Sequence, residues 1–191
     1  MKEILWIRHG QSTGNAGMPT KSRSSFPLSS LGAEQAKAIA ARIPFTPDLI
    51  VASPFRRAWE TAMPTSARYP WTPMEIWNEV HEFTYLSPAS CIGTTKQDRR
   101  PRVEAYWAKL DPDLRDGDDA ESFREVMGRA EAALERLRSR WENRILVFSH
   151  EQFIKCAQLA LYQADLPLVG KMRTFLMMPY IRNCEMIPMA L

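Results

Sequence analysis

Short, wholly apolar segments occur near both ends of the chain. Ile4–Ile7 and Ile145–Phe148 contain β-branched and aromatic residues with no alternating polar positions. Segments of this length and composition are typical of strands that are buried on both faces of a parallel sheet. Asp48–Ala52 predicts another strand, and weaker strand signals occur at Met74–Trp77 and around Cys184–Ile187. The pattern therefore predicts a mostly parallel sheet.

Helical patterns lie between the expected strands. From Ala120 to Trp141, apolar residues recur at helical spacing and form one stripe. Further helices are expected over Leu31–Arg42, Ser53–Met63, Val103–Leu110 and Gln152–Gln163. For the second of these, Ser53 would be the N-cap, Pro54 would occupy the first helical position, and Pro64 would end the helix.

This alternation of strands and helices predicts the fold class. We expect an α/β three-layer sandwich, with a mostly parallel central sheet and helices on both faces. The irregular segment of about 83–117 is interpreted as an inserted cap region that covers one face. The sequence has no internal repeat, low-complexity tract or linker, which favours a single domain over residues 1–191.

Composition and charge narrow the classes of partner. Apolar residues make up 45% and charged residues 25%, as in ordinary globular proteins. A net charge of +3 is compatible with small anionic ligands and far below the charge of a typical nucleic-acid-binding surface. The three cysteines lack metal-ligand spacing and are expected to be reduced thiols. With no signal peptide and no apolar run of membrane-spanning length, we expect a cytoplasmic protein without a membrane partner. The oligomeric state is left open.

Two of the three histidines occupy equivalent positions in the pattern. His9 and His150 each follow an apolar strand and one polar residue, which is Arg8 before His9. Either histidine alone is compatible with a packing role at a strand end. Because ligands of open α/β sheets bind beyond the carboxyl ends of the strands, the pair predicts one shared site.

Four motifs follow one another along the chain. Arg8–Gly10 continues through Gln11–Asn15, and a second motif covers Ser53–Ala62. Glu121–Ser122 opens the long helix, and His150 ends the last motif. In this order and on these elements, the motifs resemble the histidine phosphatase superfamily, also called the phosphoglycerate mutase-like family, over nearly the whole chain.

The resemblance implies roles for individual residues. His9 would be the nucleophile that becomes transiently phosphorylated, with His150 as a second catalytic residue. The implied phosphate ligands are Arg8, Ser12, Asn15 and Arg57. Arg57 is preferred to Arg56 because the phosphate-binding arginine of this family stands directly before an alanine.

These residue types suit phosphoryl transfer, in which positioning and positive charge lower most of the barrier. The planar guanidinium of arginine holds two phosphate oxygens at once and stays charged. His9 must present an unprotonated ring nitrogen, so its other nitrogen should donate to a backbone carbonyl near Gly10 or Ser12. Which nitrogen attacks is left open, and a cationic His150 would add positive charge.

A carboxyl group is needed to protonate the leaving oxygen and then to activate water. By resemblance we assign Glu82, with Glu79 as the competitor. Glu151 directly after His150 departs from the family pattern, because a carboxylate there opposes a phosphate dianion unless it points away. Several basic residues of the two segments that overhang the site are candidates for binding further anionic groups, or are ordinary surface charges: Lys21, Arg23, Lys96, Arg99, Arg100 and Arg102.

Taken together, the resemblance implies a phosphomonoester hydrolase that acts on a small phosphorylated metabolite through a phosphohistidine on His9. No metal and no cofactor is required. The alternatives are a mutase of the phosphoglycerate type and a non-catalytic phosphate-binding or regulatory module. The chain is shorter than typical mutases of the family, which favours hydrolysis. The identity of the phosphate ester is left open.

Overall fold

The computed structural model describes residues 2–191. In this part of the chain, strands form a sheet in the order β3-β2-β4-β1-β5. Their bounds are Glu3–Arg8 (β1), Leu49–Ala52 (β2), Met74–Ile76 (β3), Arg144–Ser149 (β4) and Met186–Ala190 (β5). The pairs β1–β4, β4–β2 and β2–β3 are parallel, whereas β5 runs antiparallel to β1 at the edge. The predicted mostly parallel sheet is therefore confirmed.

The register of the central strands determines where the two histidines lie. Arg8 at the end of β1 is paired with Ser149 at the end of β4. Because parallel strands end at the same edge of the sheet, His9 and His150 leave it side by side.

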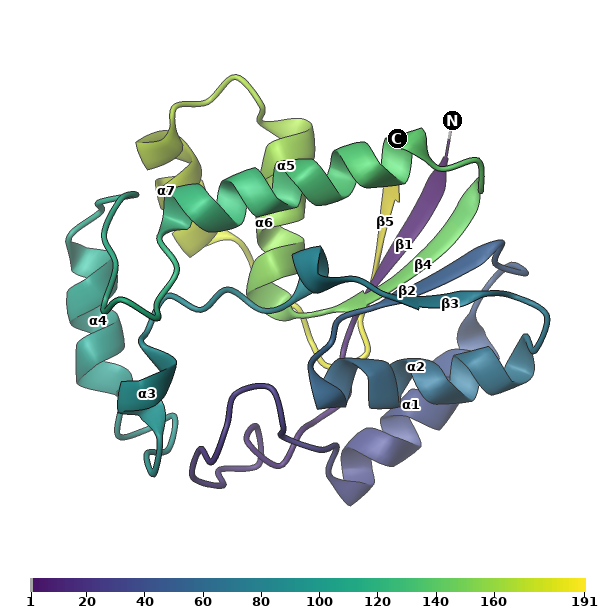
Figure 1. Ribbon diagram of the computed structural model, residues 1–191, viewed down its shortest axis with the longest axis horizontal. Coiled ribbons are helices and arrows are strands. Elements are labelled where there is room, and N and C mark those ends of the chain that lie inside the picture. Colours follow the sequence, from purple (N-terminus) through teal and green to yellow (C-terminus); the bar gives the residue numbers. More distant parts are fainter. Residues whose placement is uncertain (1) are drawn as a thin grey trace.

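Helices cover both faces of the sheet, as expected (Figure 1). The first pair, α1 (Ser30–Arg42) and α2 (Arg56–Arg68), packs on one face, where Leu5, Ile7 and Ile50 are buried. The other pair, α5 (Phe123–Ser139) and α6 (Glu151–Tyr162), packs on the opposite face over Ile4, Trp6 and Val51. Successive side chains of β1 thus point into different cores, which explains why its sequence is apolar throughout.

Two helices differ from their predicted form. The helix predicted to begin at Pro54, with Ser53 as N-cap, begins at Arg56, with Phe55 as N-cap, and it continues through Pro64 to Arg68. The proline removes only one backbone donor, and burial of side chains on both sides of it, such as Thr61 and Thr65, keeps the helix in place. Helix α7 (Leu168–Met177) was not expected, because Gly170 and the buried Lys171 obscure its apolar stripe.

The inserted segment also lies elsewhere than expected. It contains two short helices, α3 (Pro88–Cys91) and α4 (Arg100–Ala108), after the 3-10 turn η1 (Asn78–Val80). In Figure 1 both helices stand beyond the carboxyl ends of the strands. The insertion therefore caps that edge of the sheet and does not cover a face. Within residues 2–191, no helix has the length and apolar character that a membrane span requires.

Candidate active site

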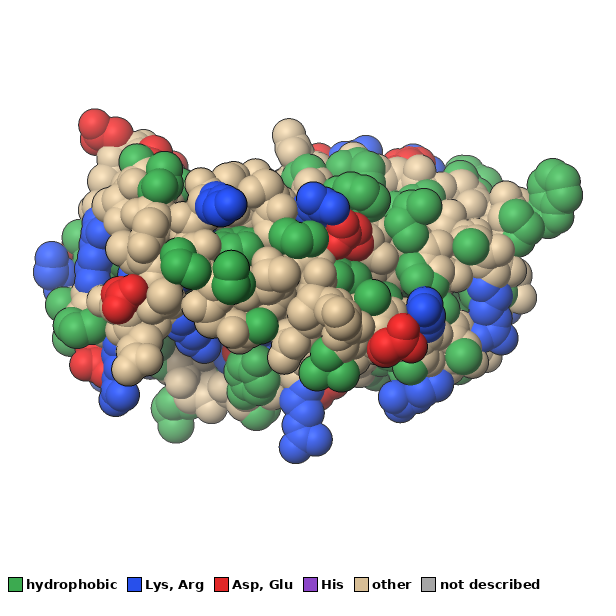
Figure 2. Space-filling model, turned by 90° about the horizontal axis from the view of Figure 1, so that it is seen from below, with side chains coloured by type: hydrophobic (Ala, Val, Ile, Leu, Met, Phe, Trp, Pro, Cys, Tyr) green, Lys and Arg blue, Asp and Glu red, His purple; other side chains and the backbone are tan. Residues whose placement is uncertain are grey.

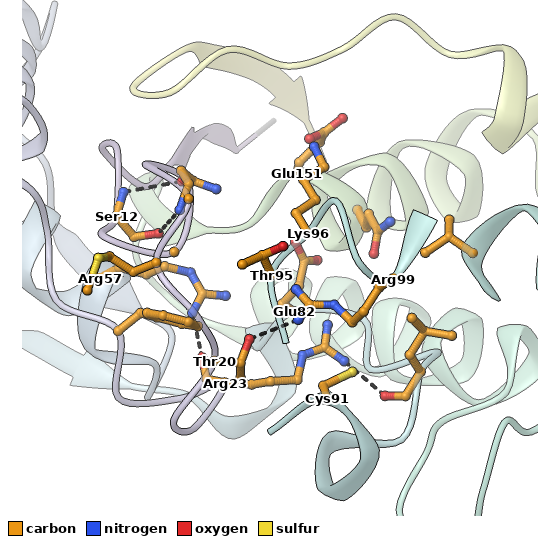
Figure 3. Close-up of a pocket in the computed structure, with 18 of the residues that line it drawn as sticks. Ser12, Thr20, Arg23, Arg57, Glu82, Cys91, Thr95, Lys96, Arg99 and Glu151 are labelled. Atoms are coloured by element: carbon orange, nitrogen blue, oxygen red, sulfur yellow. Dashed lines mark hydrogen bonds between the residues drawn. The ribbon is translucent and has the colours of Figure 1, made fainter. Parts of the chain in front are cut away.

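A cavity of about 700 Å³ opens at the carboxyl edge of the sheet, between the loop after β1 and the capping insertion (Figure 3). The predicted site residues that line it are Arg8, His9, Ser12, Asn15, Arg57 and Glu82. His150 lies behind His9, with the two ring centroids 5.1 Å apart, and is fully buried. The structure thus brings together residues from four separate parts of the sequence.

His9 forms the floor of this cavity, with 3% of its surface exposed. Its Nδ1 donates to the carbonyl oxygen of Gly10 at 2.7 Å, while its Nε2 accepts from Nε of Arg57 at 3.0 Å. Burial, followed by the charges of Arg57 and Arg8, holds the pKa of His9 well below its ordinary value, although the Gly10 bond opposes this. Nε2 is therefore the unprotonated nitrogen.

The backbone around His9 is closely packed. The amide of Gly10 donates to Oγ1 of Thr61 at 3.0 Å. A side chain at Gly10 would place its Cβ 2.7 Å from the carbonyl oxygen of Gly32, so only glycine fits. The Arg8–Gly10 motif therefore requires its glycine for close contact between the β1 end and the start of α1.

Arg57 extends from the first turn of α2 across the cavity wall. Its Nη1 donates to the carbonyl oxygen of Arg23 at 2.7 Å. Burial lowers the pKa of Arg57 to about 10, partly offset by the nearby Glu82 carboxylate. Arg57 thus remains cationic at neutral pH, and it contacts His9 directly.

Arg8 also lines the cavity. Its Nη1 donates to the carbonyl oxygen of Ile181 and stands 3.4 Å from Oε2 of Glu151. Glu151 also pairs with Lys155 at 3.1 Å and lines the cavity. The departure from the family pattern therefore places a carboxylate at the site, where two cations neutralise it.

Ser12 and Asn15 are joined by two reciprocal bonds in the loop after β1. The amide of Ser12 donates to Oδ1 of Asn15 at 3.2 Å, and the amide of Asn15 donates to Oγ of Ser12 at 3.1 Å. Both oxygens act as acceptors in these bonds. The hydroxyl proton of Ser12 and the amide group of Asn15 are therefore the donors that remain for an anion in the cavity.

His150 is the N-cap residue of α6, and its environment disfavours the cation that was expected. Its Nε2 shares a hydrogen bond of 2.8 Å with Oγ of Ser53, and its buried Nδ1 has no partner within residues 2–191. Burial, then the charges of Arg57 and His9, holds the pKa of His150 well below its ordinary value. In the protein by itself, His150 is neutral.

Glu82 and Glu79, the two candidates for the acid, have different surroundings. Oε1 of Glu82 accepts from the backbone amides of Phe83 and Phe153 at 3.0 and 3.2 Å, and the side chain lines the cavity. Burial raises the pKa of Glu82, although Arg57 opposes the shift. Glu79 points away from the cavity and pairs with Arg136 at 2.8 Å. Of these two candidates, Glu82 is the one that lines the cavity.

Four of the six additional basic residues line the cavity: Arg23, Lys96, Arg99 and Arg100. Figure 3 shows Lys96 and Arg99 opposite Arg57 across the cavity. Lys21 does not line it, and Arg102 instead pairs with Asp116. At the end of the molecule where α3 and α4 lie, Lys and Arg side chains surround a hollow in the surface (Figure 2).

Three contributors were missed by the sequence reasoning. Thr61 holds Gly10, Ser53 bonds to His150, and Nδ2 of Asn183 donates to the carbonyl oxygen of His9 at 2.8 Å. Ser53 and Thr61 stand in the second motif, which was a usable signal. Asn183 is 174 positions from His9 and follows no motif, so nothing local indicates its contact.

Comparison with known proteins places this geometry in a family. Residues 4–177 match the histidine phosphatase superfamily (branch 1). No curated protein sequence matches the chain.

Three solved structures with the same fold illustrate the likeness. A mycobacterial glucosyl-3-phosphoglycerate phosphatase shares 22% identity, with a TM-score of 0.77 over 98% of this chain and 89% of that chain. The alpha-ribazole phosphatase of Shigella flexneri shares 20%, with a TM-score of 0.73 over 95% and 86%. A phosphoserine phosphatase of Entamoeba histolytica shares 18%, with a TM-score of 0.76 over 98% and 90%. With its sequence match, its fold and its paired histidines, the chain belongs to the histidine phosphatase superfamily and is an enzyme of the phosphatase type.

Proposed function

We propose that the enzyme hydrolyses a small phosphate monoester through a phosphohistidine on His9, without a metal ion. The observation that carries this proposal is the state of His9. Its Nε2 is unprotonated and accepts from Nε of Arg57, its Nδ1–H is fixed by Gly10, and Arg8 and Arg57 line the same cavity. A neutral nucleophile with two cations at the same site suits in-line attack on a phosphate group.

In the first step, the lone pair of Nε2 attacks phosphorus while the ester P–O bond breaks. The carboxyl group of Glu82 gives its proton to the leaving oxygen. In the second step, Glu82 as carboxylate takes a proton from water, whose oxygen attacks phosphorus, and the P–N bond breaks. Inorganic phosphate leaves, and the starting protonation states of His9 and Glu82 return.

Glu82 suits both steps because its surroundings favour the protonated form without excluding the charged one. Burial raises its pKa, and Arg57 together with the amide of Phe83 stabilises the carboxylate. A carboxyl group whose pKa approaches the working pH exchanges protons most effectively. Each step therefore finds Glu82 in an accessible protonation state.

The transferred phosphoryl group would be held by Arg8, Arg57, Ser12 and Asn15. We assign His150 a supporting role behind His9. A phosphate dianion in the cavity stabilises the cationic form of a neighbouring imidazole and thereby raises its pKa. His150 thus takes up positive charge when the substrate supplies negative charge.

The size and charge of the cavity bear on the substrate. Six basic and two acidic side chains line a volume that far exceeds one phosphate group. Lys96 and Arg99 stand across the cavity from Arg57. We therefore propose that the substrate carries a second anionic group that binds to this basic wall. We expect one catalytic domain acting on a soluble metabolite of the cytoplasm.

The test is phosphoryl transfer to His9. Incubation with a labelled aryl phosphate, quenched in alkali, should leave acid-labile phosphate on the wild-type protein, and His9→Ala should carry none. Hydrolysis should fall by at least about a thousandfold in His9→Ala and persist in the presence of a chelator. His81→Ala is the matched control, since the side chain of His81 does not line this cavity.

The outcomes separate the candidate functions. Full activity in His9→Ala would refute the proposed intermediate. A stable phosphohistidine that is passed to a second phosphate ester, with little loss to water, would indicate a mutase. Phosphate binding without any covalent label would indicate a non-catalytic module.

A further inference from the structure

The segment Tyr180–Glu185, which connects α7 to β5, packs against the end of β1 that carries Arg8 and His9. The family match ends at residue 177, so this segment lies beyond it. Two backbone bonds attach it to the strand end. The amide of Cys184 donates to the carbonyl oxygen of Arg8 at 3.0 Å, and the amide of Arg8 donates to the carbonyl oxygen of Glu185 at 3.2 Å.

The same segment contacts the side chain of Arg8. The guanidinium lies 4.7 Å from the ring centroid of Tyr180, and its Nη1 donates to the carbonyl oxygen of Ile181. These contacts fix the guanidinium on the cavity wall while leaving further N–H groups for an anion. The segment does not line the cavity, but it supports Arg8, which does.

Asn183 contacts the backbone of His9. Its Nδ2 donates to the carbonyl oxygen of His9 at 2.8 Å. This carbonyl belongs to the planar peptide unit whose N–H, that of Gly10, donates to Thr61 at 3.0 Å. The peptide unit after His9 is thus held at both ends, by Asn183 on one side and Thr61 on the other.

The orientation of this peptide unit determines where the next carbonyl points. That carbonyl, of Gly10, accepts the Nδ1–H of His9 at 2.7 Å and keeps the proton off Nε2. A rotation of the peptide unit would move the carbonyl of Gly10 and release the ring. The tautomer and the direction of the His9 ring therefore depend on a contact from the far end of the chain.

The segment Tyr180–Glu185 contains a backbone conformation that is uncommon for its residue type. Cys184 has φ of +56°, a left-handed conformation that is costly for a residue other than glycine. The same residue donates its amide to Arg8. The contacts with the β1 end therefore hold the turn in a shape that presents Asn183 to His9.

We propose that Asn183 is a positioning residue for His9: it fixes the peptide unit that holds the His9 ring with Nε2 unprotonated and directed at phosphorus. The proposal rests on the proposed function of His9 as nucleophile. It assigns Asn183 no contact with the phosphate, which Arg8 and Arg57 bind. Loss of the amide donor should slow phosphorylation without weakening phosphate binding.

The test uses Asn183→Asp, which keeps the shape of the side chain and replaces the donor by a carboxylate oxygen. The rate at which an aryl phosphate phosphorylates His9 should fall at least about tenfold, because the nucleophile is misaligned. The affinity for inorganic phosphate should stay within about twofold, and Asn183→Gln, which retains a donor, should recover part of the rate. Arg182→Ala, an exposed neighbour whose side chain makes no bond in the described residues, should behave as wild type.

A wild-type rate of phosphorylation in Asn183→Asp would overturn the proposal. If the phosphorylation rate, the phosphate affinity and the melting temperature all fall together in Asn183→Asp, the proposal is also overturned, because such a result indicates a purely structural role. The nitrogen-15 shifts of the His9 ring provide a reading that needs no turnover. A single Nδ1–H tautomer in the wild type should become a mixture in Asn183→Asp, and an unchanged tautomer would overturn the proposal. If wild-type His9 takes no phosphate, the proposed function fails, and these shifts still decide the role of Asn183.

Discussion

Two titratable residues of the cavity have pKa values shifted in opposite directions. Burial lowers the pKa of His9, because its charged form is the cation, and raises the pKa of Glu82, because its charged form is the anion. Arg57 contributes to the first shift and opposes the second. The same cavity therefore favours the neutral form of both His9 and Glu82 relative to exposed residues of the same types.

The pH dependence of hydrolysis follows from these shifts. His9 loses its nucleophilic form as pH falls through its lowered pKa, and Glu82 loses its acidic form as pH rises through its raised pKa. We expect kcat/KM to be highest on the acidic side of neutrality and to decline as pH rises, measured on a phosphate ester with a poor leaving group. Glu82→Gln should lower this rate by about a hundredfold or more and remove the decline.

The substrate also titrates, because the second pKa of a phosphate monoester lies near 6. The titration of the substrate is the same for the wild type and for Glu82→Gln. The difference between their pH profiles therefore reports the titration of Glu82 alone. An alkaline decline of equal size in Glu82→Gln would assign the acid to another group.

At this scale, sequence reasoning found the residues that belong to motifs and missed those that act through the backbone. His9, Arg57 and Glu82 stand beside recognisable neighbours along the chain, and all three line the cavity. Asn183 touches the site from 174 positions away. The neutral state of His150 also escaped prediction, because it depends on complete burial, which a sequence does not display.

The connection between β2 and α2 shows how one element positions another. Ser53 was expected to cap the helix, yet it stands two residues before the N-cap Phe55 and accepts the amide of Phe55 at 3.2 Å. Its position at the end of β2 brings its hydroxyl within 2.8 Å of His150. Strand patterns predicted the sheet well because burial on both faces leaves a strong apolar signal. The exact start of a helix depends on such tertiary contacts, and here the helix starts two residues later than predicted.

Two serine substitutions separate this positioning role from ordinary capping. Ser53→Ala leaves a buried imidazole nitrogen without its partner and should lower the free energy of unfolding by about 1–3 kcal/mol. Ser122 caps α5 through a capping box with Glu125, and Ser122→Ala should cost about 1 kcal/mol. Urea unfolding measures both losses.

Only Ser53→Ala should also lower kcat, by about tenfold, because it frees the ring behind His9. Equal kcat values in the two variants would contradict a role for Ser53 in the site.

At the scale of the whole molecule, charge is concentrated at one place. The chain carries a net charge of +3, while the cavity alone is lined by six basic and two acidic side chains. The loop after β1 and the capping insertion meet there, joined by contacts such as the bond of 2.9 Å from the amide of Thr20 to the carbonyl of Thr94. The cavity is therefore a region of positive electrostatic potential, which attracts anions over about one Debye length, 8–10 Å at moderate salt.

The substitution Lys96→Ala tests whether the positive charge of the cavity selects the substrate. Its side chain is exposed on the cavity wall and has no ion-pair partner among residues 2–191, so its charge is available to a second anionic group. Lys96→Ala should lower kcat/KM about two- to fivefold for a phosphate ester that carries a carboxylate, and leave a simple aryl phosphate nearly unchanged. The difference should vanish near 0.5 M salt, roughly where screening shortens the range of an exposed charge to a few ångströms. Lys109→Ala, which removes an exposed charge of the same insertion outside the cavity, should change neither rate. An equal loss on both substrates would mean that Lys96 acts on the common phosphate, and the second anionic group would have to be abandoned.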